Sequence, residues 1–176
     1  QAFAARGVAV PGPSRYRRLI RDAVQALAEG DPTPEARAVL LDAILEGDMP
    51  DRMILSNDSF FGVPKLAVGK GVFYPGAEVK LARLRALFPP DRIELNLALR
   101  NPATFLSAVF ALAPDGDLAA SLDGTDPRAL RWSELLARIT VAVPDVQVTV
   151  WCNEDTPLLW AELIRNMAGL EPNTKI

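Results

Sequence analysis

Residues 92–110 read RIELNLALRNPATFLSAVF, and the organisation of the whole chain is clearest in this stretch. Ile93 and three leucines alternate with polar or small residues, which is the period-two pattern of a β-strand over residues 92–99. Pro102 suits the first turn of a helix, and the apolar residues after it continue a helical face. The stretch therefore predicts a strand followed at once by a helix, with Arg100 at the junction.

Strands and helices alternate on both sides of this stretch. Two further strands are predicted at residues 52–56 and 146–151, and Ser14 and Gly30 are predicted to cap and end the first helix. Three strands separated by helices call for right-handed crossovers and a parallel sheet covered on both faces. The predicted fold is a single three-layer α/β/α domain over residues 1–176. The other predicted helices occupy residues 34–45, 77–88, 102–112, 127–143 and the region after 156–157, and residues 59–77 and 114–127 are predicted to be irregular.

Composition excludes several kinds of protein. The net charge of −3 gives no overall attraction to nucleic acid or to anionic membranes, and no apolar run is long enough to span a membrane. With no histidine, the chain cannot form a Ser-His-Asp triad, a Cys-His dyad or an HExxH zinc site, and we expect no metal. The single cysteine, Cys152, excludes an internal disulfide and fits a reducing compartment, so we expect a cytoplasmic protein.

The predicted strand ends indicate where a ligand would bind, because ligands of such sheets sit at the carboxyl ends of the strands. Residues 56–58, 100–101 and 152–155 come directly after the three strands. At the second of these, an anion would meet the Arg100 guanidinium and the free N–H groups of a helix N-terminus. The alternative is that Arg100 pairs with an acidic neighbour. We predict that Asp58, Arg100 and Glu154 gather in one cleft.

The order strand, Arg-Asn-Pro, helix in LALRNPATFLSAVF resembles the 3′-phosphate motif of the sulfotransferases that use 3′-phosphoadenosine-5′-phosphosulfate. RMILSNDSFFG and VTVWCNEDTPLLWAELIRNMAGLEP are similar to two other segments of that family, so the likeness covers most of residues 50–172. The resemblance implies a P-loop-type sulfotransferase fold in which Arg100 and Ser107 bind the 3′-phosphate. In the family the serine follows the arginine by eight residues, whereas Ser107 follows by seven, a difference of about 100° around a helix. Packing against the sheet is the alternative role of Ser107.

The resemblance also implies a catalytic role for Asp58, because it stands where carbohydrate-type sulfotransferases carry an acidic base. A turn or helix cap is the alternative role of Asp58. Lys65 and Lys70 lie in the loop beyond Asp58, and each is either a ligand-binding cation or a solvated surface lysine. Trp151 either stacks on a ligand or packs in the core. Glu154 and Asp155 either border the site or cap the last helix.

The phosphosulfate-binding loop of the family, Lys-x-Gly-Thr-Thr, has no match in this chain. Residues 1–5 instead resemble the helix that follows the loop. We therefore expect the chain to be N-terminally incomplete, without the first strand and its loop, and the natural gene to encode residues before Gln1.

Two functions of different kind follow from these observations. The first is transfer of a sulfuryl group from the nucleotide donor to a hydroxyl of a carbohydrate or small metabolite, with the donor as co-substrate. The second is a binding or assembly module that keeps the sulfotransferase fold without catalysis. A small-molecule kinase is a weaker third reading, because no Walker A sequence is present.

Overall fold

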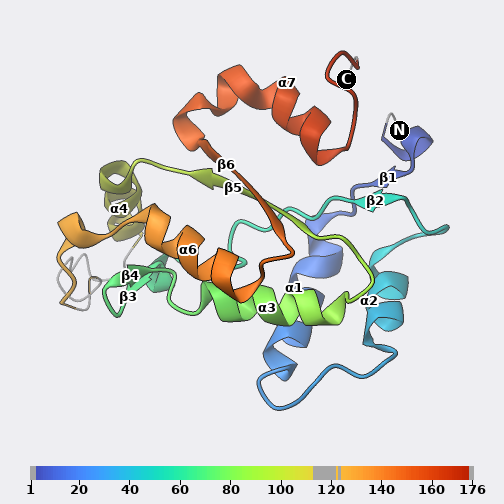
Figure 1. Cartoon of the computed structure of the whole chain (residues 1–176), viewed down its shortest axis with the longest axis horizontal. Helices are drawn as coiled ribbons and strands as arrows, with labels where there is room; N and C mark the ends of the chain where they lie inside the picture. The colour runs from blue at the N-terminus through green and yellow to red at the C-terminus, as the bar shows by residue number, and fades with distance from the viewer. Residues whose placement is uncertain (1–2, 113–121, 123, 175–176) are drawn as a thin grey trace. The chain divides into compact units, whose positions relative to one another are not determined.

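The computed structural model describes residues 3–112, 122 and 124–174 of the chain. Helices and short strands alternate along it, which confirms the predicted α/β class (Figure 1). The described residues form two compact units, and each unit is considered by itself. Unit 1 comprises Gln1–Asp58, Ala86–Phe88 and Asp155–Ile176, and unit 2 comprises Ser59–Arg85 and Pro89–Glu154. The single domain over residues 1–176 stays a prediction.

The bounds of the elements follow the predicted order closely for the longer helices and strands. In chain order they are η1 (Ala4–Arg6), β1 (Val8–Ala9), α1 (Pro13–Ala26), α2 (Ala36–Ile44), β2 (Arg52–Met53), η2 (Pro64–Leu66), β3 (Val68–Gly69), β4 (Val72–Phe73), α3 (Ala77–Leu87), β5 (Glu94–Leu99), α4 (Pro102–Ala111), η3 (Pro127–Ala129), α6 (Trp132–Ala142), β6 (Gln147–Cys152), η4 (Asn153–Asp155) and α7 (Thr156–Met167).

In unit 1, helices α1 and α2 each bury a row of apolar side chains. Tyr16, Ile20 and Val24 recur every four residues along α1 and are buried. The N-cap of α1 is Gly12, so the predicted capping role of Ser14 is wrong. Pro13 takes the first helical position and leaves Ser14 inside the first turn. The helix also ends at Ala26, four residues before the predicted terminator, with Leu27 as its C-cap.

A short strand precedes α1, and the residues before it correct one prediction about the N-terminal region. β1 pairs in parallel with β2, and the N–H of Ile54 donates to the carbonyl of Ala9 at 2.9 Å. A two-residue strand that the sequence did not predict therefore precedes α1. The expected absence of the sulfotransferase family's first strand and loop stays a prediction. The described residues before it form the single turn η1, not a helix interior. Gly7 ends this turn at φ 69°, a left-handed conformation that favours glycine, and a Cβ there would require the Asp51 carboxylate to move.

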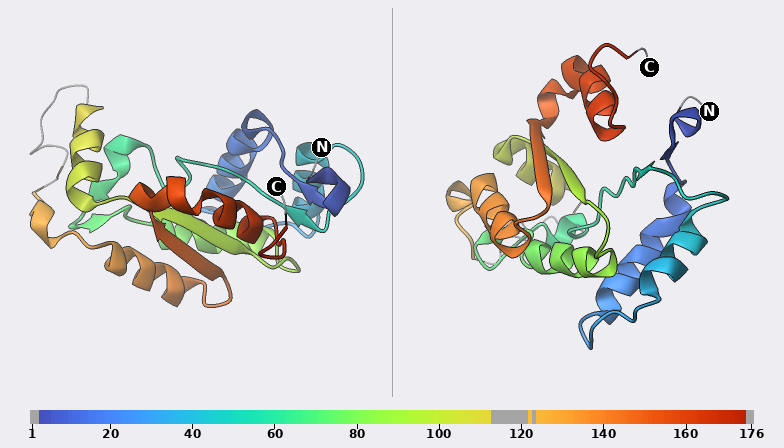
Figure 2. Two further views of the ribbon diagram at one scale, coloured as in Figure 1. Left: turned by 90° about the horizontal axis from the view of Figure 1, so that it is seen from above. Right: turned by 45° about the vertical axis from the view of Figure 1, so that its right-hand side comes forward.

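In unit 2, β5 and β6 run in parallel side by side (Figure 2). Their register pairs Glu94 with Gln147 and ends with Leu99 opposite Cys152, as expected for two strands joined by a helical crossover. Alternate residues of these strands pack against α3 and α6. The buried members of this core are Ala77, Leu81, Leu135, Ile139, Val143 and Val146.

The segment predicted to be irregular contains a β-hairpin formed by β3 and β4. Its two turn residues, Lys70 at φ 52° and Gly71 at φ 79°, are left-handed, which matches the twist of a two-residue hairpin. Phe73 at its end is fully buried, in a second core cluster with Val68 and Leu106. Most of the predicted irregular segment 114–127 lies outside the described residues.

The strands of the described residues form separate two-stranded sheets, β1–β2, β3–β4 and β5–β6. The predicted single sheet through all three expected strands is thus not seen in the hydrogen-bond ladders, and the three-layer arrangement stays a prediction. Among the described helices, none is both long and apolar enough to cross a membrane.

Candidate functional site

The junction of β5 and α4 is built as its sequence predicts. Asn101 is the N-cap of α4, and its Oδ1 accepts a hydrogen bond from the N–H of Ala103 at 2.9 Å. Pro102 holds the first helical position, where the missing N–H costs nothing. The parallel register puts this junction and the segment after β6 at the same edge of the pair, because Leu99 lies opposite Cys152. The strand-end rule therefore places Arg100 near Glu154 within unit 2.

One peptide group at this junction is bonded on both sides. The carbonyl of Arg100 accepts from the indole Nε1–H of Trp132 at 2.7 Å. The N–H of the same peptide, at Asn101, donates to Oε1 of Glu154 at 2.9 Å. The indole is itself held in an aromatic cluster, stacked on Phe73 with ring centroids 3.9 Å apart. The backbone at Arg100 is thus fixed by segments distant in the sequence.

The electrostatics of the junction favour negative charge. The hydrogen bond from the N–H of Asn101, the backbone N–H of Glu154 itself and the charge of Arg100 together lower the pKa of the Glu154 carboxyl below its usual range, outweighing desolvation. The Arg100 side chain is exposed. Its charge acts on the neighbouring Glu154 carboxylate, so the alternative of an acidic partner for Arg100 stays open. A cationic group remains at the end of β5.

Ser107 lies on the exposed surface of α4, so it does not pack in the core. Its hydroxyl donates to the carbonyl of Ala103 at 2.9 Å, a bond within the helix that is common for serine. The oxygen keeps free lone pairs, but the hydroxyl proton is already used. A phosphate at this position would have to replace that internal bond.

Asp58 belongs to unit 1, whereas Arg100 and Glu154 belong to unit 2, so their gathering in one cleft stays a prediction. Asp58 forms an exposed ion pair with Arg17, in which Nη1 and Oδ1 are 3.1 Å apart. The same guanidinium donates through Nε to the carbonyl of Ser56 at 3.1 Å. The buried Tyr16 hydroxyl bonds both backbone groups of Ser56 at 2.6 Å. Helix α1 thus fixes the segment that carries Asp58.

The segment between β1 and α1 has the strand–loop–helix order in which P-loop-type proteins bind phosphate. Residues 10–14 read VPGPS, so the order is present while the Lys-x-Gly-Thr-Thr residues are not. Gly12 caps α1 without a side-chain acceptor for its first N–H groups. Sequence analysis did not predict this arrangement, because a two-residue strand is too short to show an alternation of apolar and polar residues.

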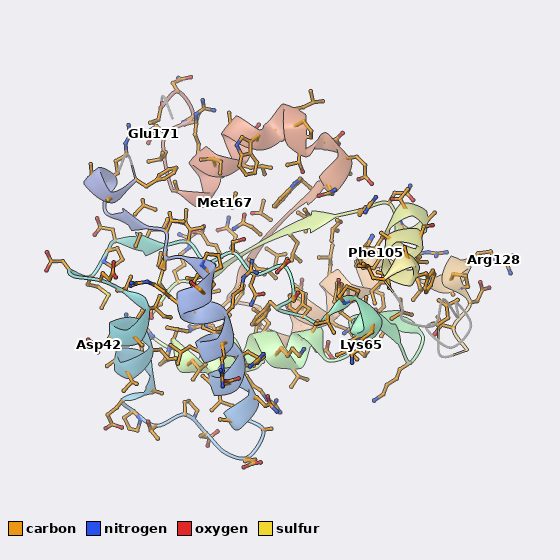
Figure 3. The ribbon with its side chains drawn as sticks, turned by 180° about the vertical axis from the view of Figure 1, so that it is seen from behind. Asp42, Lys65, Phe105, Arg128, Met167 and Glu171 are labelled. Carbon is orange, nitrogen blue, oxygen red and sulfur yellow. The ribbon has the colours of Figure 1, made fainter. Side chains whose placement is uncertain are left out.

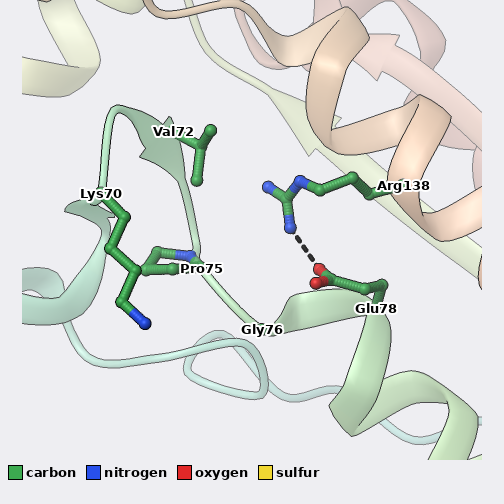
Figure 4. A pocket seen from close by; sticks show the side chains of 6 residues that line it. All are labelled: Lys70, Val72, Pro75, Gly76, Glu78 and Arg138. Atoms are coloured by element: carbon green, nitrogen blue, oxygen red, sulfur yellow. Dashed lines mark hydrogen bonds and ion pairs between the residues drawn. The ribbon is translucent and has the colours of Figure 1, made fainter.

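The remaining predicted residues are spread over unit 2. Lys65 is exposed on η2, and Trp151 is half-buried on β6. Lys70 borders an open pocket of about 500 Å³ with Glu78 and Arg138 (Figure 4). The Arg138 guanidinium is committed to in-chain acceptors, so the available cation of this pocket is Lys70.

Comparison of the chain with protein-family models, with curated proteins and with solved structures found no match. Within the described residues, no group of three or more His, Cys, Asp or Glu side chains is placed to hold a metal ion. The residue that sequence reasoning missed at this junction is Trp132. The residues around Trp132 do not indicate its hydrogen bond, because the acceptor is the carbonyl of Arg100, 32 residues earlier in the chain.

Proposed function

We propose that this chain is a sulfotransferase-like domain of the three-layer α/β/α class, which binds 3′-phosphoadenosine-5′-phosphosulfate and transfers its sulfuryl group to a hydroxyl of a carbohydrate or small metabolite. The observation that carries the proposal is the exposed Arg100 between the end of a parallel strand and the first turn of α4. There a guanidinium and the positive end of the helix dipole favour the same anion.

In this proposal Arg100 binds the 3′-phosphate, and the Ser107 hydroxyl donates to the same phosphate in place of its bond to the Ala103 carbonyl. Asp58 takes the proton of the acceptor hydroxyl as the acceptor oxygen bonds to sulfur. The bond between sulfur and the bridging phosphate oxygen breaks in the same transfer, and 3′,5′-bisphosphoadenosine leaves with that electron pair. No metal takes part.

A second function, a non-catalytic module of the same fold, is favoured by one observation. Two N–H groups at the start of α4 are already bonded within the chain, one to the Asn101 side chain and one to the Glu154 carboxylate. A helix N-terminus occupied in this way has less capacity for an external anion.

Calorimetry with 3′,5′-bisphosphoadenosine and 5′-AMP separates the two functions, because only the first ligand carries a 3′-phosphate. The wild-type chain should bind the bisphosphate more tightly than 5′-AMP. Arg100→Ala should weaken the bisphosphate by roughly ten- to a hundredfold, the worth of a charge-assisted hydrogen bond, and leave 5′-AMP almost unchanged.

Arg128→Ala is the matched control, because Arg128 is an exposed arginine of the same unit that pairs only locally, with Asp126 (Figure 3). It should bind both ligands like the wild type. If the wild type shows no preference for the bisphosphate, or if Arg100→Ala keeps that preference in full, the sulfotransferase function is contradicted and the non-catalytic module gains.

A further inference from the structure

Both the carbonyl and the N–H of the peptide between Arg100 and Asn101 are hydrogen-bonded. Its carbonyl meets the indole N–H of Trp132 at 2.7 Å, and its N–H meets Oε1 of Glu154 at 2.9 Å. A rotation of this peptide would break both bonds and turn the carbonyl toward the Glu154 carboxylate, where two oxygens would repel each other. The two contacts therefore support one orientation of the peptide.

The donor on the carbonyl side is rigid. The Trp132 ring stacks on Phe73 at 3.9 Å, and Phe105 of α4 meets it edge-on at 5.0 Å (Figure 3 labels Phe105). Phe73 is fully buried at the end of the hairpin. Because the ring is packed on two sides, the indole N–H has a fixed direction, which a flexible donor on a loop would lack.

We propose that Trp132 is a positioning residue for the Arg100 site. It keeps the Arg100 carbonyl turned to the indole and the Asn101 N–H turned to the Glu154 carboxylate, so that the backbone carrying the Arg100 guanidinium has one orientation. This inference rests on the proposed function as far as the ligand is concerned, since the anion is the 3′-phosphate. The orientation of the peptide itself does not depend on any ligand.

The test compares Trp132→Phe, which keeps an aromatic ring and removes the N–H donor, with Phe73→Leu, which weakens the ring stacking and keeps the donor. Both variants lose packing, so both are compared by hydrogen exchange at Asn101 relative to exchange at Leu97 within β5. In Trp132→Phe the Asn101 amide should exchange about two- to tenfold faster relative to Leu97, the worth of one hydrogen bond. In Phe73→Leu, where the donor remains but its ring loses one of its two packing partners, this ratio should rise by less than in Trp132→Phe.

Ligand binding supplies the second measurement. Trp132→Phe should reduce the preference for 3′,5′-bisphosphoadenosine over 5′-AMP by about two- to tenfold, whereas Phe73→Leu, which keeps the donor, should reduce it by less. A general loss of packing would weaken both ligands alike and leave the ratio unmoved. If the wild type has no such preference, the proposed function fails while the exchange measurement still decides the role of Trp132.

The wild-type protein provides a check that needs no variant. The indole N–H of Trp132 should be protected from exchange with water, unlike a free exposed indole. Rapid exchange of that proton, or an unchanged Asn101-to-Leu97 ratio in Trp132→Phe, would overturn the positioning role.

Discussion

Replacement of Arg138 by methionine should destabilise unit 2 more than any other arginine substitution considered for this protein. The Arg138 Nε donates to Glu134 at 2.6 Å, and a second nitrogen donates to the carbonyl of Phe73 at 2.6 Å. The guanidinium also pairs with Glu78 and lies 3.5 Å from the carbonyl of Tyr74. These bonds join α6 to the end of β4, to Tyr74 after it and to the first turn of α3 (Figure 4).

The magnitude follows from what Arg138→Met leaves behind. Two carboxylates and two carbonyls lose their shared donor, and the Arg138 side chain is only 22% exposed, so water replaces the donor incompletely. Tyr74 also sits at φ 45°, a left-handed conformation that costs about 1–2 kcal/mol and that the carbonyl contacts help to hold. We expect a loss of about 2–4 kcal/mol in the free energy of unfolding, which is roughly 5–12 °C in Tm for a chain of this size.

Urea denaturation followed by circular dichroism measures this loss, with equal m-values as the condition for comparing midpoints. Arg138→Lys should recover only part of it, because one ammonium group cannot reach all of these acceptors. The control is Arg128→Met, whose side chain is 90% exposed and which should stay within about 0.5 kcal/mol of the wild type. A loss below about 1 kcal/mol in Arg138→Met would refute the reasoning.

Two further predictions concern exposed carboxylates of unit 2. The hydrogen bond from Arg85 lowers the pKa of Asp145, so this pair stabilises the fold at neutral pH and the contribution disappears as the pH falls through the lowered pKa. Denaturation series at several pH values should show Asp145→Asn less stable than the wild type at pH 7, with the difference shrinking below about pH 4; a constant difference would contradict this. Glu154→Gln keeps an acceptor for the Asn101 N–H but removes a negative charge beside Arg100. Calorimetry should show roughly two- to fivefold tighter binding of 3′,5′-bisphosphoadenosine. Weaker binding would mean that the charge of Glu154 does not oppose the ligand.

Local patterns predicted the elements that are long enough to show a period. The alternation over residues 92–99 predicted β5, and Pro102 predicted the start of α4, because a first-turn proline acts within one turn of helix. Three short strands, β1, β3 and β4, were not predicted for the same reason, whereas β2 was predicted as part of a longer apolar run over residues 52–56. β1 and the hairpin strands are two residues each, so neighbours across the ladder, not the alternation of their own side chains, define them.

The candidate site likewise has features that the sequence predicted and features that only the structure showed. The sequence by itself determined the residue types at the strand ends, the absence of histidine chemistry and the position of Arg100 before a helix. Only the tertiary structure decided what holds that arginine in place: Trp132 lies 32 residues from Arg100, and Glu154 lies 53 residues from Asn101. Strand period and helix capping depend on neighbours within a few residues, whereas these bonds form only after packing of the aromatic cluster and pairing of β5 with β6 bring distant backbone and side-chain groups within 3 Å of each other.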